Sequence, residues 1–279
     1  MRKKNSGWSL LELLVVIVML ALLGAVLFPA LARTGSNSHS LQCLNNLRQL
    51  MAAISMYTHE NHDLLPPNPD NGTTVPGYNW CPGIAAIGGS EEFNSDILKD
   101  PTRSLLSPYI QNDVTLFRCP AEPRIGTSTA PSTLGRKVRA ARTVSMNGAV
   151  GTDPYSAKGQ LAVNGAWLDG QHNNTRNGPW FTYAKTTDIV FPSPASLYVL
   201  VDENPLSIND AYFAFSMVGS QLIDSPGIYH NFGGSFAFAD GSAQIHKWQD
   251  ARTANAGGAI SAPGDPDILW IQQRTSVHK

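Results

Sequence analysis

Several residues of this chain have side chains that could bind a metal ion or transfer protons. His230 and Asp240 are separated by nine residues, and Gly241 follows directly. His230 could act with Asp240 as a metal ligand or as a catalytic base. No second histidine or cysteine stands at ligand spacing, however, so we favour a structural role for both residues. Asp240-Gly241 then forms the turn of a hairpin, and His230 orders the entry into its first strand.

Carboxylates form a second group of candidate ligands. Asp202, Glu203 and Asp210 supply the hard oxygen atoms that Ca²⁺ prefers, which makes them candidates for a calcium site. Since the sequence contains no D-x-D-x-D-G loop, we favour the interpretation that they are solvated loop acids. The segment 59–63 (His-Glu-Asn-His-Asp) lacks the H-E-x-x-H spacing of zinc enzymes, so we interpret it as the polar end of a helix.

Composition and motifs argue against several classes of function. The 279 residues are 42% hydrophobic and carry a formal net charge of −1, which excludes pervasive disorder and gives no electrostatic reason to bind nucleic acid. The chain has no phosphate-binding P-loop, no dinucleotide glycine fingerprint and no G-x-S-x-G elbow. We therefore expect no enzymatic activity, no catalytic residue and no cofactor other than the calcium considered above.

The N-terminal segment predicts export through a membrane. Residues 13–32 contain no charge, and at about 1.5 Å per residue a helix of this length spans the hydrocarbon layer of a bilayer. Arg2, Lys3 and Lys4 precede it, which keeps the N-terminus cytoplasmic and places the remainder outside. The segment could be a plain signal anchor, or a secretory signal cut after Ala32.

A third interpretation depends on the residues around Gly7. Gly7 ends the basic leader, Trp8 is aromatic, Glu12 is the fifth residue from Trp8, and Pro29 lies within the apolar run. This combination resembles the class III signal of type IV pilins and type II secretion pseudopilins. The resemblance implies that a prepilin peptidase cuts after Gly7 and methylates the new amine on Trp8. It also implies that Glu12 meets the N-terminal amine of a neighbouring subunit, a role compatible with a capping box formed by Ser9 and Glu12.

Further stretches resemble a prepilin-type family with a His-x9-Asp-Gly signature, abundant in planctomycetes and verrucomicrobia. They are His230 with Asp240-Gly241, Cys43-Leu-Asn-Asn-Leu-Arg-Gln49, Phe117-Arg-Cys-Pro120, and Pro194-Ala-Ser-Leu-Tyr-Val-Leu-Val-Asp202-Glu203. The resemblance favours a disulfide between Cys43 and Cys119, which would leave Cys81 free or paired differently. Because major secretion pseudopilins bind calcium, it also keeps the carboxylate candidates open.

The elements that must position these residues begin with a helix. Apolar residues recur at spacings of three and four and predict an amphipathic helix to about Glu60, followed by the prolines of 66–69. They are Leu41, Leu44, Leu47, Met51, Ile54 and Tyr57. The polar run 33–40 predicts a flexible joint between this helix and the apolar one.

The remaining residues predict a β-rich head with long loops. Short apolar or alternating runs are separated by turn residues at 114–117, 143–146, 180–183, 197–201, 211–217, 235–239 and 243–248. We expect an α+β protein in which a long N-terminal helix packs on a mostly antiparallel sheet. Its predicted parts are a leader (1–7), a transmembrane and assembly helix (8–32), an amphipathic continuation (33–61) and the head (62–279).

These observations lead to two hypotheses about function. In the first, the chain is a structural pilin-like or pseudopilin-like subunit of the bacterial inner membrane. Its partners would then be the prepilin peptidase, other subunits and an assembly platform, with the head periplasmic or extracellular. In the second, it is an anchored or secreted binding module that does not polymerise, and its loop aromatics stack on glycans. Those aromatics are Tyr78, Trp80, Trp167, Trp180 and Tyr183.

Overall fold

The structure is a computed structural model that describes residues 10–172 and 178–279. The leader, with Gly7 and Trp8, lies outside the described residues. Along the first helix, the side chains of Glu12 and of residues 21–37, Pro29 among them, also lie outside the described set. The predictions made for these positions therefore remain predictions.

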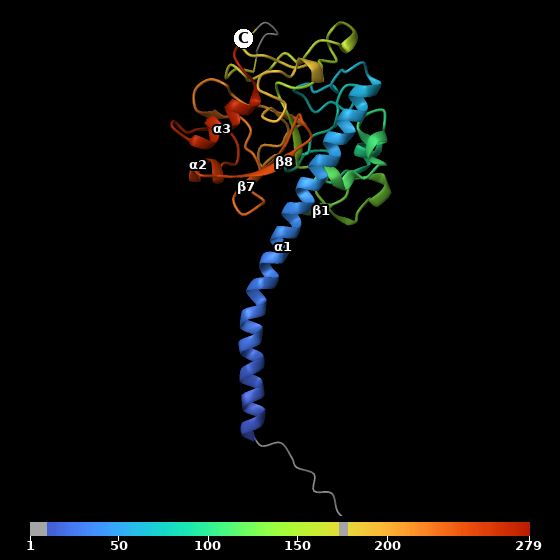
Figure 1. The fold of residues 1–279 in the computed structure, drawn as a ribbon. Coiled ribbons are helices and arrows are strands. Elements are labelled where there is room, and N and C mark those ends of the chain that lie inside the picture. Colours follow the sequence, from blue (N-terminus) through green and yellow to red (C-terminus); the bar gives the residue numbers. More distant parts are fainter. Residues whose placement is uncertain (1–9, 173–177) are drawn as a thin grey trace, which may run out of the picture.

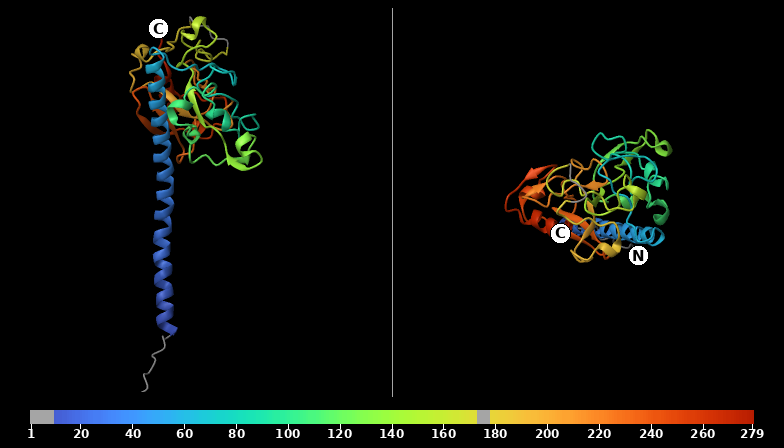
Figure 2. Two further views of the ribbon diagram at one scale, coloured as in Figure 1. Left: turned by 90° about the vertical axis from the view of Figure 1, so that its right-hand side faces the viewer. Right: turned by 90° about the horizontal axis from the view of Figure 1, so that it is seen from above.

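Helix α1 (Leu10–Glu60) is a single element of 51 residues. At 1.5 Å per residue it is about 77 Å long. Figures 1 and 2 show its C-terminal half lying along one side of the head and its N-terminal half projecting away from it. The predicted joint at 33–40 is wrong, since the helix continues through these residues. Extending an existing helix adds a backbone hydrogen bond per residue, and this gain exceeds the small propensity penalties of glycine and serine.

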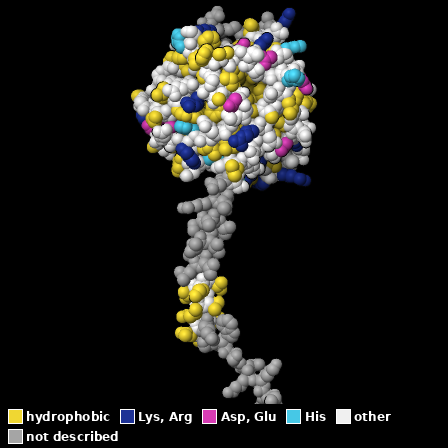
Figure 3. Space-filling model, in the orientation of Figure 1, with side chains coloured by type: hydrophobic (Ala, Val, Ile, Leu, Met, Phe, Trp, Pro, Cys, Tyr) yellow, Lys and Arg dark blue, Asp and Glu magenta, His cyan; other side chains and the backbone are white. Residues whose placement is uncertain are grey.

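The described side chains at the free end of α1 are all apolar and exposed. They belong to Leu10, Leu11 and residues 13–20, and their exposed fractions run from 39% to 84%. Figure 3 shows these side chains, in yellow, on the part of α1 that projects away from the head. Within the described part of the chain, no helix contains a stretch long and apolar enough to cross a membrane.

The head is built on a five-stranded sheet with the order β5-β3-β4-β7-β8. All neighbours are antiparallel except β3 and β5, which run parallel, so the expected α+β fold with a mostly antiparallel sheet is confirmed. The strands are β3 (Val144–Asn147), β4 (Tyr198–Asp202), β5 (Tyr212–Phe213), β7 (Gly233–Phe238) and β8 (Ala243–Lys247).

Smaller elements complete the head around this sheet. Two antiparallel pairs are β1 (Ile125–Thr127) with β2 (Lys137–Arg139), and β6 (Gln221–Leu222) with β9 (Ile260–Ser261). The other α-helices are α2 (Ala251–Ala254) and α3 (Pro266–Thr275). The 3₁₀ helices are η1 (Asp96–Lys99), η2 (Ser107–Ile110), η3 (Val114–Phe117), η4 (Pro131–Thr133), η5 (Ala157–Gly159) and η6 (Thr186–Asp188).

The two faces of strand β7 differ in side-chain size. Phe236 and Phe238 pack in the aromatic cluster that includes Ile268 of α3, whereas Ala237 belongs to the core that contains α1. Ser235 also faces α1, where its hydroxyl lies 3.3 Å from the sulfur of Cys43. Since side chains alternate along a strand, the run Ser-Phe-Ala-Phe presents a small face to the helix and a large face to the opposite core. The small face lets α1 approach the sheet closely.

The buried stripe of α1 follows the sequence Cys43, Leu47, Leu50 and Ile54, each at most 2% exposed. This 4-3-4 spacing keeps the side chains on one helix face. The predicted stripe shares Leu47 and Ile54 with it, and the predicted Met51 is also buried. The prediction for Leu41 is wrong, because that side chain is 63% exposed. Leu41 faces away from the head, whereas the hydroxyl of its neighbour Ser40 already contacts His230, so periodicity alone assigned Leu41 to the wrong helix face.

Most predicted strands form, with two exceptions. The run 114–117 is the 3₁₀ helix η3 instead of a strand, because the carboxylate of Asp113 caps it by accepting from the backbone N–H of Thr115. Residues 180–183 contribute only isolated bridges, Trp180 to His278 and Tyr183 to Val150. The hairpin of β7 and β8 is confirmed, with five paired positions and a turn at Asp240-Gly241.

Two leucines of α1 test how firmly the helix is held. Leu47→Ala should lower the free energy of unfolding by about 2–5 kcal/mol, because it opens a cavity between helix and sheet. Leu41→Ala, the same change six residues earlier on an exposed position, should stay within about 0.5 kcal/mol. Urea unfolding of the full chain in detergent, followed by tryptophan fluorescence, measures both. Equal losses would show that the docked face is not the one described.

Candidate functional site

Four potential metal ligands meet where helix α1 joins the head. They are Cys43, Cys119, Asp202 and His230, and their ligand atoms all lie within 4.8 Å of one another. Each residue is buried, with an exposed fraction of 2% or less. Thiols, a carboxylate and an imidazole gathered away from solvent are a donor set typical of a metal centre.

Each member comes from a different element. Cys43 lies on the buried stripe of α1, and Cys119 lies two residues beyond the end of η3. Asp202 is the last residue of β4, and His230 precedes β7 by three residues. The cysteine of the helix is 159 residues from the aspartate it contacts, and Cys119 is 111 residues from the histidine. The docking of α1 against the sheet therefore creates the site.

Short polar contacts connect the four side chains in pairs. The thiol of Cys43 donates to Oδ2 of Asp202 over 2.8 Å. The sulfur of Cys119 lies 3.3 Å from Nε2 of His230. Thr143 links the two pairs, since its hydroxyl donates to Oδ1 of Asp202 and accepts from the backbone N–H of Cys119, both over 2.8 Å.

The surroundings favour the uncharged form of each group for which a shift is resolved. The pKa of Cys43 is raised well above its usual value, by hydrogen bonding with Cys119 and by burial. Burial raises the pKa of Asp202 to about 6, although bonds donated by Cys43 and Thr143 oppose the rise. Burial and the nearby Lys247 lower the pKa of His230 to about 4. The imidazole is therefore neutral at pH 7, as a metal ligand must be.

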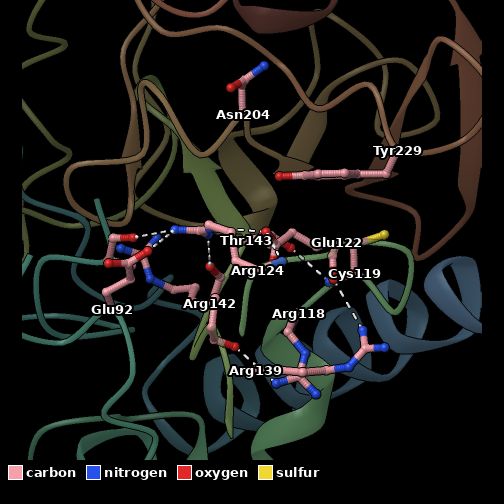
Figure 4. Close-up of polar contacts among 12 residues, drawn as sticks. Glu92, Arg118, Cys119, Glu122, Arg124, Arg139, Arg142, Thr143, Asn204 and Tyr229 are labelled. Carbon is pink, nitrogen blue, oxygen red and sulfur yellow. Dashed lines mark hydrogen bonds and ion pairs between the residues drawn. The ribbon is translucent and has the colours of Figure 1, made fainter. Parts of the chain in front are cut away.

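A polar network beside the cluster fixes the loop that carries Cys119 (Figure 4). Arg124 forms ion pairs with Glu92 (3.2 Å) and Glu122 (2.7 Å). Arg139 donates to the carbonyl of the residue that follows Cys119, over 2.9 Å. Because Glu92 and Glu122 are buried, these charge-assisted bonds are stronger than surface ion pairs and hold the loop in one conformation.

The three calcium candidates do not form one site. Asp202 belongs to the thiol and imidazole cluster, whereas Glu203 accepts from Ser207 and Asp210 accepts from the backbone N–H of Tyr212. Among the side chains that the structure describes, the cluster containing Asp202 is the only set of three or more potential ligands close enough to share a metal ion. The interpretation as solvated loop acids is also wrong, because all three are buried.

The structure separates His230 from Asp240. They lie at opposite ends of β7, and Asp240 is exposed in the turn, where it accepts from the backbone N–H and hydroxyl of Ser242. Gly241 has a φ of +84°, the left-handed conformation that the turn requires. The structural role expected for Asp240-Gly241 is therefore confirmed. His230 does more than order the entry into β7, because its Nε2 atom also lies 3.3 Å from the sulfur of Cys119 in the buried cluster.

The three cysteines are free thiols in this structure. Cys43 and Cys119, the pair favoured for a disulfide, are neighbours in the cluster but are not bonded to each other. Cys81 is also buried, yet it lies outside the cluster. Burial raises the pKa of its thiol to about 12, so it is protonated and unreactive at pH 7.

The structure also shows the surroundings of two other predicted groups, the segment 59–63 and the loop aromatics. The segment 59–63 covers the end of α1 and the turn after it, where Asp63 accepts hydrogen bonds from Thr186 and Thr187. Of the proposed glycan-stacking aromatics, Trp80 and Tyr183 are at most 1% exposed and so cannot meet a sugar ring. The other three, Tyr78, Trp167 and Trp180, are half-buried.

Sequence reasoning missed the cluster because its members are far apart in the chain. One signal was available, however. Each of the four stretches quoted for the family resemblance contributes one member, Cys43, Cys119, Asp202 or His230. When several stretches of one family signature are far apart in the chain, their residues are candidates for contact with one another in the folded protein.

A long helix docked on a mostly antiparallel sheet, with a buried polar junction between them, defines the class as α+β. A family model described as a protein of unknown function (DUF1559) matches residues 40–188, which is just over half of the chain. The chain belongs to this family. The matched segment contains Cys43 and Cys119 but ends before the His-x9-Asp-Gly stretch. No curated protein and no solved structure matches the chain.

A buried acid outside the cluster gives a prediction about pH. Burial and the neighbouring Asp70 raise the pKa of Asp210 to about 7. Between its unfolded pKa near 3.8 and this value the folded state holds a proton that the unfolded state has lost. Stability contributed by Asp210 must therefore fall as the pH rises through this window, by at most about 1.4 kcal/mol per pH unit.

Asp210→Asn removes this titration and keeps an oxygen for the backbone N–H of Tyr212. The variant should gain stability relative to the original chain between about pH 4 and pH 7, and the difference should level off above pH 7. Denaturant unfolding of both proteins across this range measures it, since the other groups titrate in both. A difference that does not change with pH would contradict the assignment.

Proposed function

We propose that this chain is a pilin-like structural subunit that assembles through the projecting half of helix α1. The observation that carries the proposal is the division of one continuous helix into two environments. Its C-terminal part is buried against the sheet, while its described N-terminal side chains are apolar and exposed. An element of this kind needs an apolar partner outside its own head.

The apolar surface at the free end covers every side of the helix. Residues 13–20 are eight consecutive apolar residues, more than two helical turns, so no polar face remains to meet water. Leaving such a surface in water costs about 25 cal/mol per Å². A lipid bilayer before assembly, and neighbouring helices after it, would both remove this surface from water.

Glu12 is the only ionisable residue between Leu10 and Ala32. A carboxylate in apolar surroundings is unfavourable by about 2–3 kcal/mol or more unless a positive charge neutralises it. Cleavage after Gly7 would create an amine on Trp8, about one helical turn away. In our proposal, the amine of one subunit neutralises Glu12 of the next, which sets the register between subunits.

The family membership is compatible with a pilin-like surface protein. Following the resemblance, we place the uncleaved chain in the bacterial inner membrane with its head in the periplasm. The prepilin peptidase, an assembly platform and other subunits are its proposed partners. The role is structural and not enzymatic. The alternative of a glycan-binding module gains no support from Trp80 and Tyr183, which are buried.

The mature N-terminus tests the processing step. Mass spectrometry of the chain isolated from membranes of its native host should find N-methylated Trp8 as the first residue. Gly7→Val should leave the leader attached, because a branched side chain replaces the glycine at the cleavage site. Ser6→Ala, one residue earlier, serves as the control and should be processed normally. A native chain that begins at Met1 or Arg33 would overturn prepilin processing.

The role of Glu12 requires a separate experiment. Glu12→Ala should reduce incorporation of the chain into sheared surface filaments by about tenfold or more, because the subunit amine loses its partner. The near-ultraviolet circular dichroism of the head should not change. Glu60→Ala, the same change at the opposite end of α1, should leave incorporation intact. Unchanged filament yield with Glu12→Ala would exclude this role.

A further inference from the structure

We propose that Cys43, Cys119, Asp202 and His230 bind one Zn²⁺ ion, and that this ion fastens helix α1 to the head. The four ligands come from the helix, the loop after η3, the end of β4 and the approach to β7. A metal ion held by all of them would join the assembly helix to three separate parts of the sheet and its loops. This site is independent of the proposed filament, since metal binding requires only the head and the adjoining helix.

The spacing of the ligand atoms suits a tetrahedral ion. With zinc bonds of about 2.0–2.3 Å, neighbouring ligand atoms lie about 3.3–3.8 Å apart. The sulfur of Cys119 and Nε2 of His230 are 3.3 Å apart, and the sulfur of Cys43 is 2.8 Å from Oδ2 of Asp202. All four atoms lie within 4.8 Å of one another. Shifts of about an ångström or less in these side chains would admit the ion.

Neighbouring hydroxyl groups orient two of the ligands. The hydroxyl of Ser40 lies 3.1 Å from Nδ1 of His230, which turns Nε2 toward the cluster. Thr143 donates a hydrogen bond to Oδ1 of Asp202, so that Oδ2 of the same carboxylate faces Cys43. Ligands whose second polar atom bonds to another protein group are typical of built metal sites.

The charges of the cluster also favour a cation. Asp202 is fully buried, and among the described residues it forms no ion pair. A buried carboxylate without a cation is unfavourable when ionised. Binding of Zn²⁺ releases the thiol protons of Cys43 and Cys119 to solvent and leaves a net charge of −1 on the site. Lys247, which donates to the backbone carbonyl of His230, stands beside the cluster to balance that charge.

The donor set selects zinc and a structural role. Two thiolates and an imidazole are soft and borderline ligands, which suit Zn²⁺ and do not suit Ca²⁺. Four protein ligands fill the tetrahedron, and all are buried, so no position remains for a reacting water. A Cys43–Cys119 disulfide would consume both thiolates, so the zinc centre and the disulfide exclude each other.

The full chain, purified in detergent without chelators, provides the test. Elemental analysis should find one zinc per chain, and Co²⁺ in its place should give thiolate charge-transfer absorption. Cys43→Ser, Cys119→Ser and His230→Gln should each lower zinc affinity by about tenfold or more. Cys81→Ser is the matched control, because Cys81 is equally buried but lies outside the cluster. It should retain both the zinc and the cobalt spectrum.

The thermal midpoint supplies a second readout that does not depend on how well the cysteine variants fold. A chelator should lower the midpoint of the original chain, and added Zn²⁺ should restore it. In His230→Gln the glutamine amide is neutral and similar in length to the imidazole, and this variant should need a Zn²⁺ concentration at least about tenfold higher for the same rise in midpoint. The proposal is overturned by a native chain that carries a Cys43–Cys119 disulfide, or by a reduced chain without zinc that gives no cobalt charge transfer. Equal zinc loss in Cys81→Ser would also overturn it.

Discussion

The contact between the C-terminal half of α1 and the small face of the sheet is the constraint on which the rest of the structure depends. Leu47, Leu50 and Ile54 enter a core whose opposing strand offers Ser235 and Ala237 instead of large side chains. The large residues of the same strand, Phe236 and Phe238, fill the other core. One strand thus decides both how close the helix lies and where the aromatic core forms.

This close approach explains why a polar cluster can exist at the junction. Cys43 continues the apolar stripe by one helical turn toward the N-terminus, and Ser235 opposite leaves space for its sulfur. Burial there makes charged forms of these groups unfavourable, and a bound cation would offset that cost. The interface that anchors the helix therefore also holds the four potential ligands, and a metal ion bound there would fasten α1 to the head.

The two halves of α1 lie in different environments but belong to one continuous helix. In the proposed subunit, the projecting half would offer its apolar surface to other molecules, and the docked half would transmit force on that surface to the head. A helix without a joint at 33–40 transmits such a force directly. Fastening the docked half through residues on three other segments would distribute the force over the sheet, which suits a subunit held in a filament by its helix.

The sequence by itself determined the amphipathic helix that ends at Glu60, the α+β class and the hairpin at Asp240-Gly241, because these depend on local periodicity and turn chemistry. Only the structure showed that this helix continues without a joint through residues 33–40. It also determined the apolar N-terminal segment with its single acid, Glu12. Only the tertiary structure decided that Asp202 and His230 meet Cys43 and Cys119, and that Asp240 does not join them. Contacts across 159 residues leave no local pattern, since they arise from the packing of a helix face on a strand face. Leu41 was wrongly assigned to the buried stripe because the head packs on a different face of the helix, and 114–117 was wrongly assigned to a strand because Asp113 caps a 3₁₀ helix there.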